Sequence, residues 1–278
     1  MTILVTGSRG HVGRSVLSQL LAAGQPVRAL RHHQEPNDPS SSVEIMEGDL
    51  ARPQTLRLAL EGVRKVFLYG NAQAIDEFIA EATKAGVTHV VALSSASVAA
   101  SNADVNPIAR RHLAIERALA DSELGTTFLR PAAFATNTLR WTPSIRAESV
   151  VRAPYPNSYV APIHEADIAA VAVRGLTGEG HEGASYFLTG PEALSQRQQV
   201  RLIAGVLGRP LRFEEQTPGE AREEMIKTVP GEIVDTVLGY LAASDGAPRM
   251  ITDTVAHITG RPALTFAQWV GDHLVDFQ

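Results

Sequence analysis

Cysteine is absent from the 278 residues, so disulfide bonds, zinc–thiolate sites and catalytic thiols are excluded. No apolar run reaches the roughly 18 residues that a membrane-spanning helix needs, and we expect no membrane partner. The first residues already form a strand pattern, from which we expect no signal peptide and a cytoplasmic location. A net charge of −5 without a basic stretch argues against nucleic acid as a partner.

Lysine is also scarce, and Lys65, Lys84 and Lys227 are the only three. None of them follows a tyrosine at a distance of four residues, so the sequence Tyr-x-x-x-Lys does not occur. Many dinucleotide-dependent reductases use that pair for proton transfer. Its absence argues against ordinary alcohol dehydrogenase chemistry, although it does not exclude an enzyme.

Short apolar runs alternate with helical patterns through the first half of the chain. Strands are expected over 2–6, 25–30, 43–46, 65–69, 89–93 and 126–129, and helices over 12–23, 52–60, 72–85 and 107–122. Near-continuous apolar strands separated by helices are typical of a parallel sheet that is covered on both faces. The sequence therefore predicts an α/β fold of the Rossmann type, with a doubly wound parallel sheet.

The second half has a less regular pattern. Helices are expected over 165–176, 195–207, 219–227, 232–242 and 265–273, and loop with short strands over the proline-rich segment 140–162. We expect a dinucleotide-binding domain at 1–155 and a smaller α+β substrate lobe at 156–278. A strand and helix near 160–176 are expected to return to the Rossmann core.

The first expected strand is followed by three glycines in the spacing G-x-x-G-x-x-G: Gly7, Gly10 and Gly13. Such a loop lets the backbone turn tightly, approach a pyrophosphate, and pack the next helix close to the sheet. The N-terminus of that helix then attracts the anion. The pattern predicts dinucleotide binding, and Arg9 and His11 are further candidates for contact with phosphate.

The end of the second strand indicates which dinucleotide is bound. An NAD site usually has an acidic residue there, whereas this chain has Arg31, with Arg28 close behind. A guanidinium group suits a 2′-phosphate, so NADP(H) is the expected cofactor. The alternative is that Arg31 is only a solvated strand end.

Two further turns are expected to line the cofactor. Asp49 and Leu50 follow the third strand, where the acid either accepts from the adenine amino group or serves as a nearby helix N-cap. Tyr69, Gly70 and Asn71 follow the fourth strand, where they would line the path from diphosphate to nicotinamide, or form a plain turn.

His112 and Glu116 share the spacing of the missing Tyr–Lys pair, on the expected helix 107–122. Residues four apart lie on one helical face, and we place His112 within the face that packs on the sheet and Glu116 at its edge. His112 is the candidate catalytic proton donor, with a core histidine as the alternative. Glu116 would fix its tautomer or bind a neighbouring arginine. No third ligand at useful spacing supports a metal site, and we expect none.

The chain resembles the atypical short-chain dehydrogenase/reductase superfamily, in its NmrA-like branch. The resemblance covers nearly the whole chain and depends on TGSRGHVG, EGDLARPQTLRLALEGV, VVALSSASV and HLAIERALADSELGTTFLRPAAFATN. The branch includes type-2 NAD(P)H:quinone oxidoreductases and related redox-sensor proteins. The segment ADSELG departs from it, because the family more often has Ser-Gly before the sixth strand.

The resemblance implies roles for named residues. The diphosphate would be held by Gly7, Arg9, Gly10, His11 and Val12, and the 2′-phosphate by Arg31. Near the nicotinamide it places Ser94, Ser95, Arg130, Pro131 and Phe134, with Asn137 toward the substrate. Ser95 stands where typical relatives have a catalytic serine, but the tyrosine that such a serine assists is missing.

Together these features predict an NADPH-dependent reductase that passes hydride to a quinone or similar conjugated small molecule. The acceptor would lie between the sheet and the C-terminal lobe, where Phe134, Trp141, Tyr155 and Tyr159 form flat walls or belong to the core. The alternative is an NADP(H)-sensing regulator without catalysis. The sequence leaves room for an oligomer.

Overall fold

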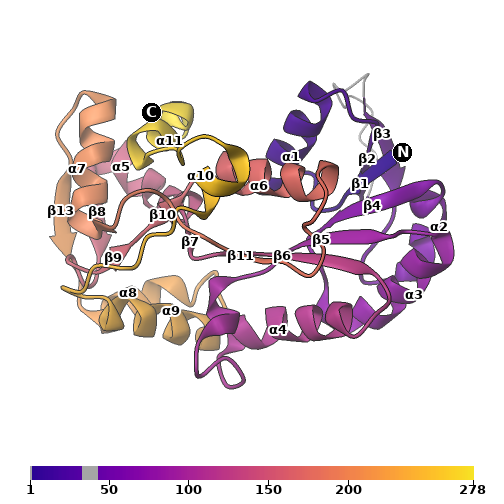
Figure 1. Ribbon diagram of the computed structural model, residues 1–278. Helices are drawn as coiled ribbons and strands as arrows, with labels where there is room; N and C mark the ends of the chain where they lie inside the picture. The colour runs from indigo at the N-terminus through magenta and orange to yellow at the C-terminus, as the bar shows by residue number, and fades with distance from the viewer. Residues whose placement is uncertain (1, 33–42) are drawn as a thin grey trace. The chain divides into compact units, whose positions relative to one another are not determined.

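A computed structural model of the chain describes residues 2–32 and 43–278 (Figure 1). The chain divides into two compact units. The first contains Met1–Val105, Ala109–Pro131 and Glu165–Phe187, and the second contains Asn106–Ile108, Ala132–His164 and Leu188–Gln278. None of the helices in the described part is both long and apolar enough to cross a bilayer.

The first unit is built on a seven-stranded sheet in the order β11-β6-β5-β4-β1-β2-β3. Its strands are β1 (Thr2–Val5), β2 (Val27–Arg31), β3 (Glu44–Glu47), β4 (Val63–Leu68), β5 (His89–Leu93), β6 (Gly125–Pro131) and β11 (Ser185–Leu188). The five neighbouring pairs from β6 to β3 are parallel. The expected Rossmann-type α/β fold is therefore confirmed. The central strands are buried on both faces, as their continuous apolar runs predict.

Helices cover both faces of this sheet. They are α1 (His11–Ala22), α2 (Arg57–Leu60), α3 (Ile75–Ala85), α4 (Pro107–Ala120) and α6 (Glu165–Thr177), with short 3-10 helices at Pro53–Leu56, Ala72–Ala74 and Ala96–Ala99. In Figure 1, α1 and α6 lie over one face and α3 and α4 over the other. The expected helix at 52–60 is split into a 3-10 turn that contains Pro53 and one turn of α-helix. Residues of α2, α3 and α4 form one core with the sheet around Leu4, Val66 and Phe78.

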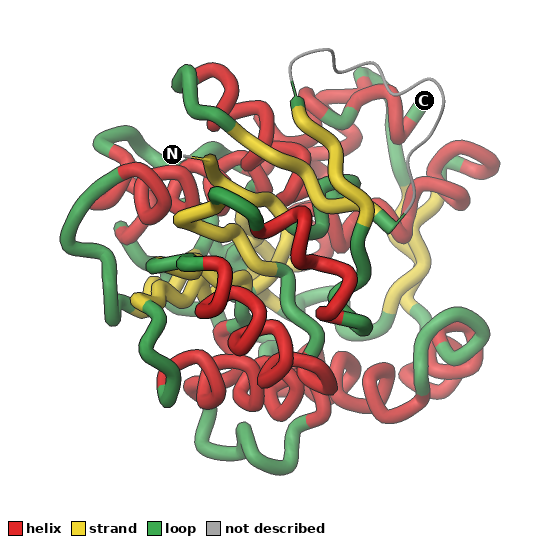
Figure 2. Tube along the Cα trace, turned by 90° about the vertical axis from the view of Figure 1, so that its right-hand side faces the viewer, coloured by secondary structure: helices red, strands yellow, loops and turns green. Residues whose placement is uncertain are grey.

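The second unit consists of helices and three two-stranded ladders, shown in red and yellow in Figure 2. Its helices are α5 (Thr142–Glu148), α7 (Gln196–Leu207), α8 (Pro218–Met225), α9 (Gly231–Ala243), α10 (Thr254–Thr259), α11 (Phe266–Asp272) and α12 (Leu274–Phe277), with a 3-10 helix at Ala135–Trp141. Its strands are β7 (Ala133–Phe134), β8 (Val150–Ala153), β9 (Tyr159–Val160), β10 (Pro162–Ile163), β12 (Leu194–Ser195) and β13 (Arg212–Glu215). The helix α5 lies in a segment that we expected to be loop.

The compact units are divided differently from the expected 1–155 and 156–278. Helix α6 belongs to the first unit as expected, but the strand of the main sheet beside β6 is β11. The short strands near residue 160 instead pair with β12 and β7 in the second unit. The assignment of cofactor and substrate roles to the two halves stays a prediction.

His89, the first residue of β5, is buried, with 2% of its surface exposed. Its Nε2 lies 2.9 Å from the Thr127 hydroxyl, which donates to the carbonyl oxygen of His181 at 2.6 Å. Nε2 therefore carries the ring proton. Nδ1 is buried, with the nearest carboxylate oxygen of Glu182 at 3.9 Å. Burial, followed by the charge of Lys65, lowers the pKa of His89 below its usual value.

This histidine predicts a pH dependence of stability. Its pKa in the unfolded chain is about 6.5 and is lower in the folded protein, so below pH 6.5 the unfolded state binds more protons. Stability is full above that pH and falls as the pH decreases toward the folded pKa. We expect His89→Gln to lose less free energy of unfolding between about pH 7.5 and pH 5.5 than the wild type. Urea unfolding measures this. His257→Gln, at an exposed position of α10, is the control, and equal slopes for all three proteins would contradict the prediction.

Candidate dinucleotide site

The glycine loop joins β1 to α1 and has the geometry that its spacing predicts. Gly7 has φ +60°, in the left-handed region that favours glycine, and its carbonyl accepts from the Gly10 N–H at 2.9 Å. A Cβ at Gly13 would lie 2.2 Å from the Gly7 carbonyl oxygen. Only glycine at position 13 therefore lets α1 begin this close to the loop.

Gly10 serves as the N-cap of α1, with φ −73° and ψ 161° and no capping side chain. No acidic residue stands in the first turn of this helix, and Val12 in that turn is buried. The N–H groups of the first turn and the helix dipole therefore favour an anion at this end. A diphosphate fits such a cradle, with the glycine backbone as its nearest wall.

A cavity of about 290 Å³ lies beside this loop within the first unit. It is lined by Gly7, Ser8, Arg9, Gly10, Leu30, Arg31, His32, Gly48, Leu50 and Tyr69. Arg9 comes from the loop and Arg31 from the last position of β2, so two guanidinium groups border the cavity from different segments. None of these lining residues is acidic. The cavity has the charge that suits a phosphate group next to the adenosine ribose.

Arg28, which precedes Arg31 on the same strand, has its own partners outside the cavity. Its guanidinium makes two hydrogen bonds to Glu44 at 2.9 and 3.0 Å and also donates to the carbonyl oxygens of Leu58, Ala59 and Glu61. Arg28 therefore joins β2 to β3 and to the end of α2, and it does not line the cavity.

Asp49 folds back on its own turn. Its Oδ1 accepts from the Ala51 N–H at 2.8 Å and its Oδ2 from the Arg52 Nε at 3.0 Å. The hydrogen bond from Ala51, ahead of the charge of Arg52, lowers the pKa of Asp49. The N-cap of the following 3-10 helix is Arg52, so the helix-cap alternative for Asp49 is wrong. Its contact with adenine stays a prediction, while the neighbouring Leu50 lines the cavity.

The turn after β4 borders the same cavity. Tyr69 packs its side chain against Gly7, where an added Cβ would lie 3.1 Å from the tyrosine Cβ. A Cβ at Gly70 would lie 3.2 Å from the Ile115 side chain, so Gly70 allows α4 to approach. The Asn71 side chain accepts from the Gln73 N–H and caps a 3-10 helix. Tyr69 lines the cavity, whereas Gly70 and Asn71 do not, and their contact with the cofactor stays a prediction.

A buried charge network follows β5. Ser94, which comes directly after that strand, donates to Glu116 Oε1 of α4 at 2.5 Å. Arg130 of β6 donates to the same carboxylate through Nε at 3.0 Å and through another nitrogen at 2.5 Å. Glu116 is 4% exposed, so its placement at the edge of the helix face was wrong, and the expected bond to a neighbouring arginine is confirmed. The sequence pointed to Glu116 but not to its burial, because helical periodicity treats charged residues as surface. The available signal was a carboxylate beside the apolar Ile115 and Leu119.

Ser95 and the residues after β6 have mostly local roles. Ser95 caps the 3-10 helix at Ala96–Ala99, accepting from the Ser97 N–H at 3.2 Å. Pro131 is buried at the end of β6, while Phe134 lies half-buried in β7 of the second unit. Trp141 is buried in the core of that unit, and the contribution of these residues to a substrate wall stays a prediction.

His112 is half-buried on α4, and its Nδ1 is sealed from solvent without a hydrogen-bond partner among the described residues. Burial, followed by the positive charge of Arg111, lowers the pKa of His112, and Glu116 opposes this only in part. Both carboxylate oxygens of Glu116 are directed to Ser94 and Arg130. Glu116 therefore does not fix the tautomer of His112 by a hydrogen bond.

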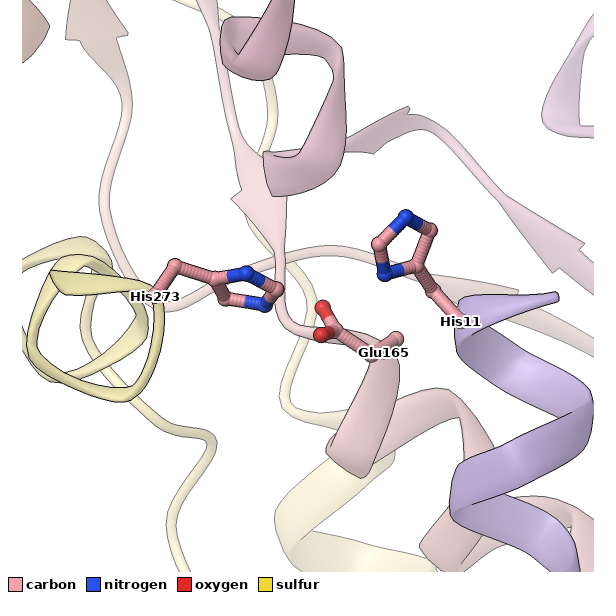
Figure 3. Close-up of side chains that lie close together, drawn as sticks. All are labelled: His11, Glu165 and His273. Carbon is pink, nitrogen blue, oxygen red and sulfur yellow. The ribbon is translucent and has the colours of Figure 1, made fainter. Parts of the chain in front are cut away.

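His11 is the first residue of α1, and its ring lies beside Glu165 at the start of α6 (Figure 3), with ligand-type atoms of the two within 4.8 Å. The two helices pack together, and Gln19 donates to the Ala166 carbonyl oxygen at 2.9 Å. His11 does not line the cavity. The third residue drawn, His273, belongs to the second unit. Two ligands from one unit do not make a metal site, and the expectation that none exists stays a prediction.

The parallel doubly wound sheet, the glycine loop and the basic cavity define a dinucleotide-binding protein of Rossmann type. Residues 7–179 match the NAD(P)H-binding family, and this chain belongs to that family. It is 41% identical over 280 residues to the (4-alkanoyl-5-oxo-2,5-dihydrofuran-3-yl)methyl phosphate reductase of Streptomyces griseus, with 99% of both chains covered. It is 34% identical over 285 residues to an NAD(P)H azoreductase of Xenophilus azovorans, again with 99% of both covered.

A similar solved structure is the NADPH complex of a quinone oxidoreductase from Escherichia coli. The TM-score is 0.79 at 24% identity, with 99% of this chain and 100% of that one covered. The resemblance to reductases of this group is thus confirmed at the level of the family, and the chain is an NAD(P)H-dependent oxidoreductase.

The charge network predicts that two variants, each of which removes a carboxylate that binds an arginine, lose different amounts of unfolding free energy. Glu116→Gln leaves the Arg130 charge without its buried partner, and we expect a loss of about 2 kcal/mol, less than for a fully buried pair because the Arg130 side chain is 26% exposed. Asp104→Asn removes an exposed ion pair between Asp104, which precedes α4, and Arg117 of α4, and should cost well under about 1 kcal/mol. Chemical denaturation measures both, and equal losses would argue against a buried network.

Proposed function

We propose that this protein is an NADPH-dependent reductase that transfers hydride to a quinone or a similar conjugated small molecule. The observation that carries this proposal is the chemistry beyond β5 and β6. The guanidinium of Arg130 donates two hydrogen bonds to the carboxylate of Glu116, and the chain has no Tyr-x-x-x-Lys pair. The residues there are not equipped to remove a proton from an alcohol.

Such a site suits an acceptor that is already strongly electron-poor. A quinone accepts hydride readily and gives an oxygen anion that water can protonate, so positioning of donor and acceptor supplies most of the catalysis. The named substrates of the relatives are of this kind: a quinone, an azo compound, and an unsaturated lactone that carries an alkanoyl group. In the quinone and the lactone the acceptor double bond is conjugated with a carbonyl group, and the azo compound offers an N=N double bond.

The preference for NADPH is supported by the charges around the cavity. A bound dinucleotide supplies the hydride, and the chain's part is to hold it and to exclude water. Gly7, Gly10 and the first turn of α1 would hold the diphosphate, and Arg9 and Arg31 a 2′-phosphate. None of the lining residues is an acid of the kind that binds the ribose hydroxyls in an NAD site.

Turnover tests the reductase proposal. We expect NADPH oxidation with at least one member of a panel of quinones, unsaturated lactones and azo dyes. Gly10→Asp should abolish it, because the carboxylate would meet the diphosphate. The backbone of position 10 is extended and aspartate is a good N-cap, so the variant should fold with unchanged stability. No turnover with any acceptor, together with very different affinities for NADPH and NADP+, would contradict the proposal in favour of a redox sensor.

Arg31 tests the cofactor preference. Arg31→Ala removes a charged hydrogen-bond donor, so the Kd for NADPH should increase about tenfold or more. The Kd for NADH should change little because NADH lacks the 2′-phosphate. Arg201→Ala, at an exposed arginine of α7, controls for the loss of one charge and should leave both Kd values unchanged. A wild type that prefers NADH, or equal losses for both dinucleotides in Arg31→Ala, would refute the role of Arg31.

A further inference from the structure

The charge network places His112 beyond the carboxyl end of β5. Glu116 of α4 accepts from Ser94, the residue directly after that strand, and Ile115 packs against Gly70, just after β4. Helix α4 then leads back to the start of β6, so it runs antiparallel to the strands and its N-terminal turns project past their carboxyl ends. His112 is one turn earlier than Glu116, about 6 Å farther out along the helix. Ligands of open parallel sheets bind at that edge.

The two nitrogens of His112 have different surroundings. Nδ1 is sealed without an acceptor, whereas Nε2 is not among the sealed atoms of this half-buried ring. An N–H that is buried without an acceptor is among the rarest features of folded proteins, so the ring proton belongs on Nε2. Arg111 and Glu116 are the charged groups whose fields act on the ring, and Glu116 is saturated by Ser94 and Arg130. His112 thus presents a neutral ring with one N–H donor.

The topology indicates which part of a ligand meets this donor. The cavity with Arg9 and Arg31 lies beside β1 and β2, in the half of the sheet that takes the adenosine side of a dinucleotide. His112 lies on the other half, beyond β4 and β5. We propose that the Nε2–H of His112 donates to a hydroxyl of the nicotinamide-side ribose and positions that ring; this rests on the proposed binding of NADPH.

This role differs from the proton donor expected from the sequence. A histidine that donates a proton must be in its imidazolium form when the acceptor is reduced, and protonation would place a second N–H at the sealed Nδ1. The lowered pKa of His112 agrees with this argument, since it favours the neutral ring at neutral pH. A neutral imidazole can still bind and orient a hydroxyl group.

Binding without turnover tests the proposal. The Kd for NADPH and for adenosine 2′,5′-bisphosphate, which lacks the nicotinamide half, is measured for wild type, His112→Ala and His112→Gln without an acceptor. We expect His112→Ala to weaken NADPH about fivefold, the loss of one neutral hydrogen bond, and to leave the bisphosphate unchanged. The amide nitrogen of Gln reaches the place of Nε2, so His112→Gln should recover most of the NADPH affinity.

The other outcomes overturn the proposal in distinguishable ways. Unchanged NADPH binding in His112→Ala, with a change only in KM for the acceptor, would assign the donor to the substrate. Parallel weakening of both ligands would indicate a structural role of the ring, as would a His112→Gln variant no better than His112→Ala. A wild type that binds the bisphosphate but not NADPH would instead refute the proposed function, because the adenosine half would then be the only ligand recognised.

Discussion

The site depends on one close contact, the packing of the first helix against the loop that precedes it. The Cα of Gly13 lies so near the Gly7 carbonyl oxygen that no side chain fits between them. This contact brings the N-terminus of α1 to the end of β1, where the N–H groups of its first turn are presented together with the glycine backbone. The positive φ of Gly7 serves the same contact, since it turns the chain directly from strand to helix. The anion site is therefore a consequence of backbone packing and needs no particular side chain.

Side chains add selectivity to this backbone site through the placement of charge. Around the adenosine side, Arg9 and Arg31 remain at the cavity, while Asp49 is held by its own turn and Arg28 by Glu44. Beside β5 and β6, at the other half of the sheet, the positive charge of Arg130 is neutralised by Glu116. The adenosine side of the site is thus basic, while the charges of Glu116 and Arg130 compensate each other on the side of β5 and β6. That distribution suits tight binding of a phosphorylated dinucleotide and an acceptor that needs little acid or base assistance.

Most of the first unit was predictable from its periodicity. The predicted positions agree with the structure to within a few residues for β1 and β5, which are apolar runs, and for α3, which ends at a glycine. Other elements were not predictable. Strand β11 lies next to β6 although 53 residues lie between Pro131, where β6 ends, and Ser185, where β11 begins. Nothing in the residues of β11 indicates that neighbour. In the second unit the helices expected at 195–207, 232–242 and 265–273 correspond to α7, α9 and α11. Its strands were not predictable, because two to four residues carry too few positions to show a period.

The candidate site divides along the same line. The sequence by itself determined the glycine loop, the cofactor-side arginine at the end of β2 and the absence of a Tyr–Lys pair, because each depends on residues adjacent in the chain. Only the tertiary structure decided that Arg31 faces the cavity while Arg28 does not, and that Glu116 is buried against Ser94 and Arg130. The physical reason is that the position and the role of a charged side chain depend on the groups to which it binds. Those partners come from strands and helices that the sequence places far apart and the sheet brings together.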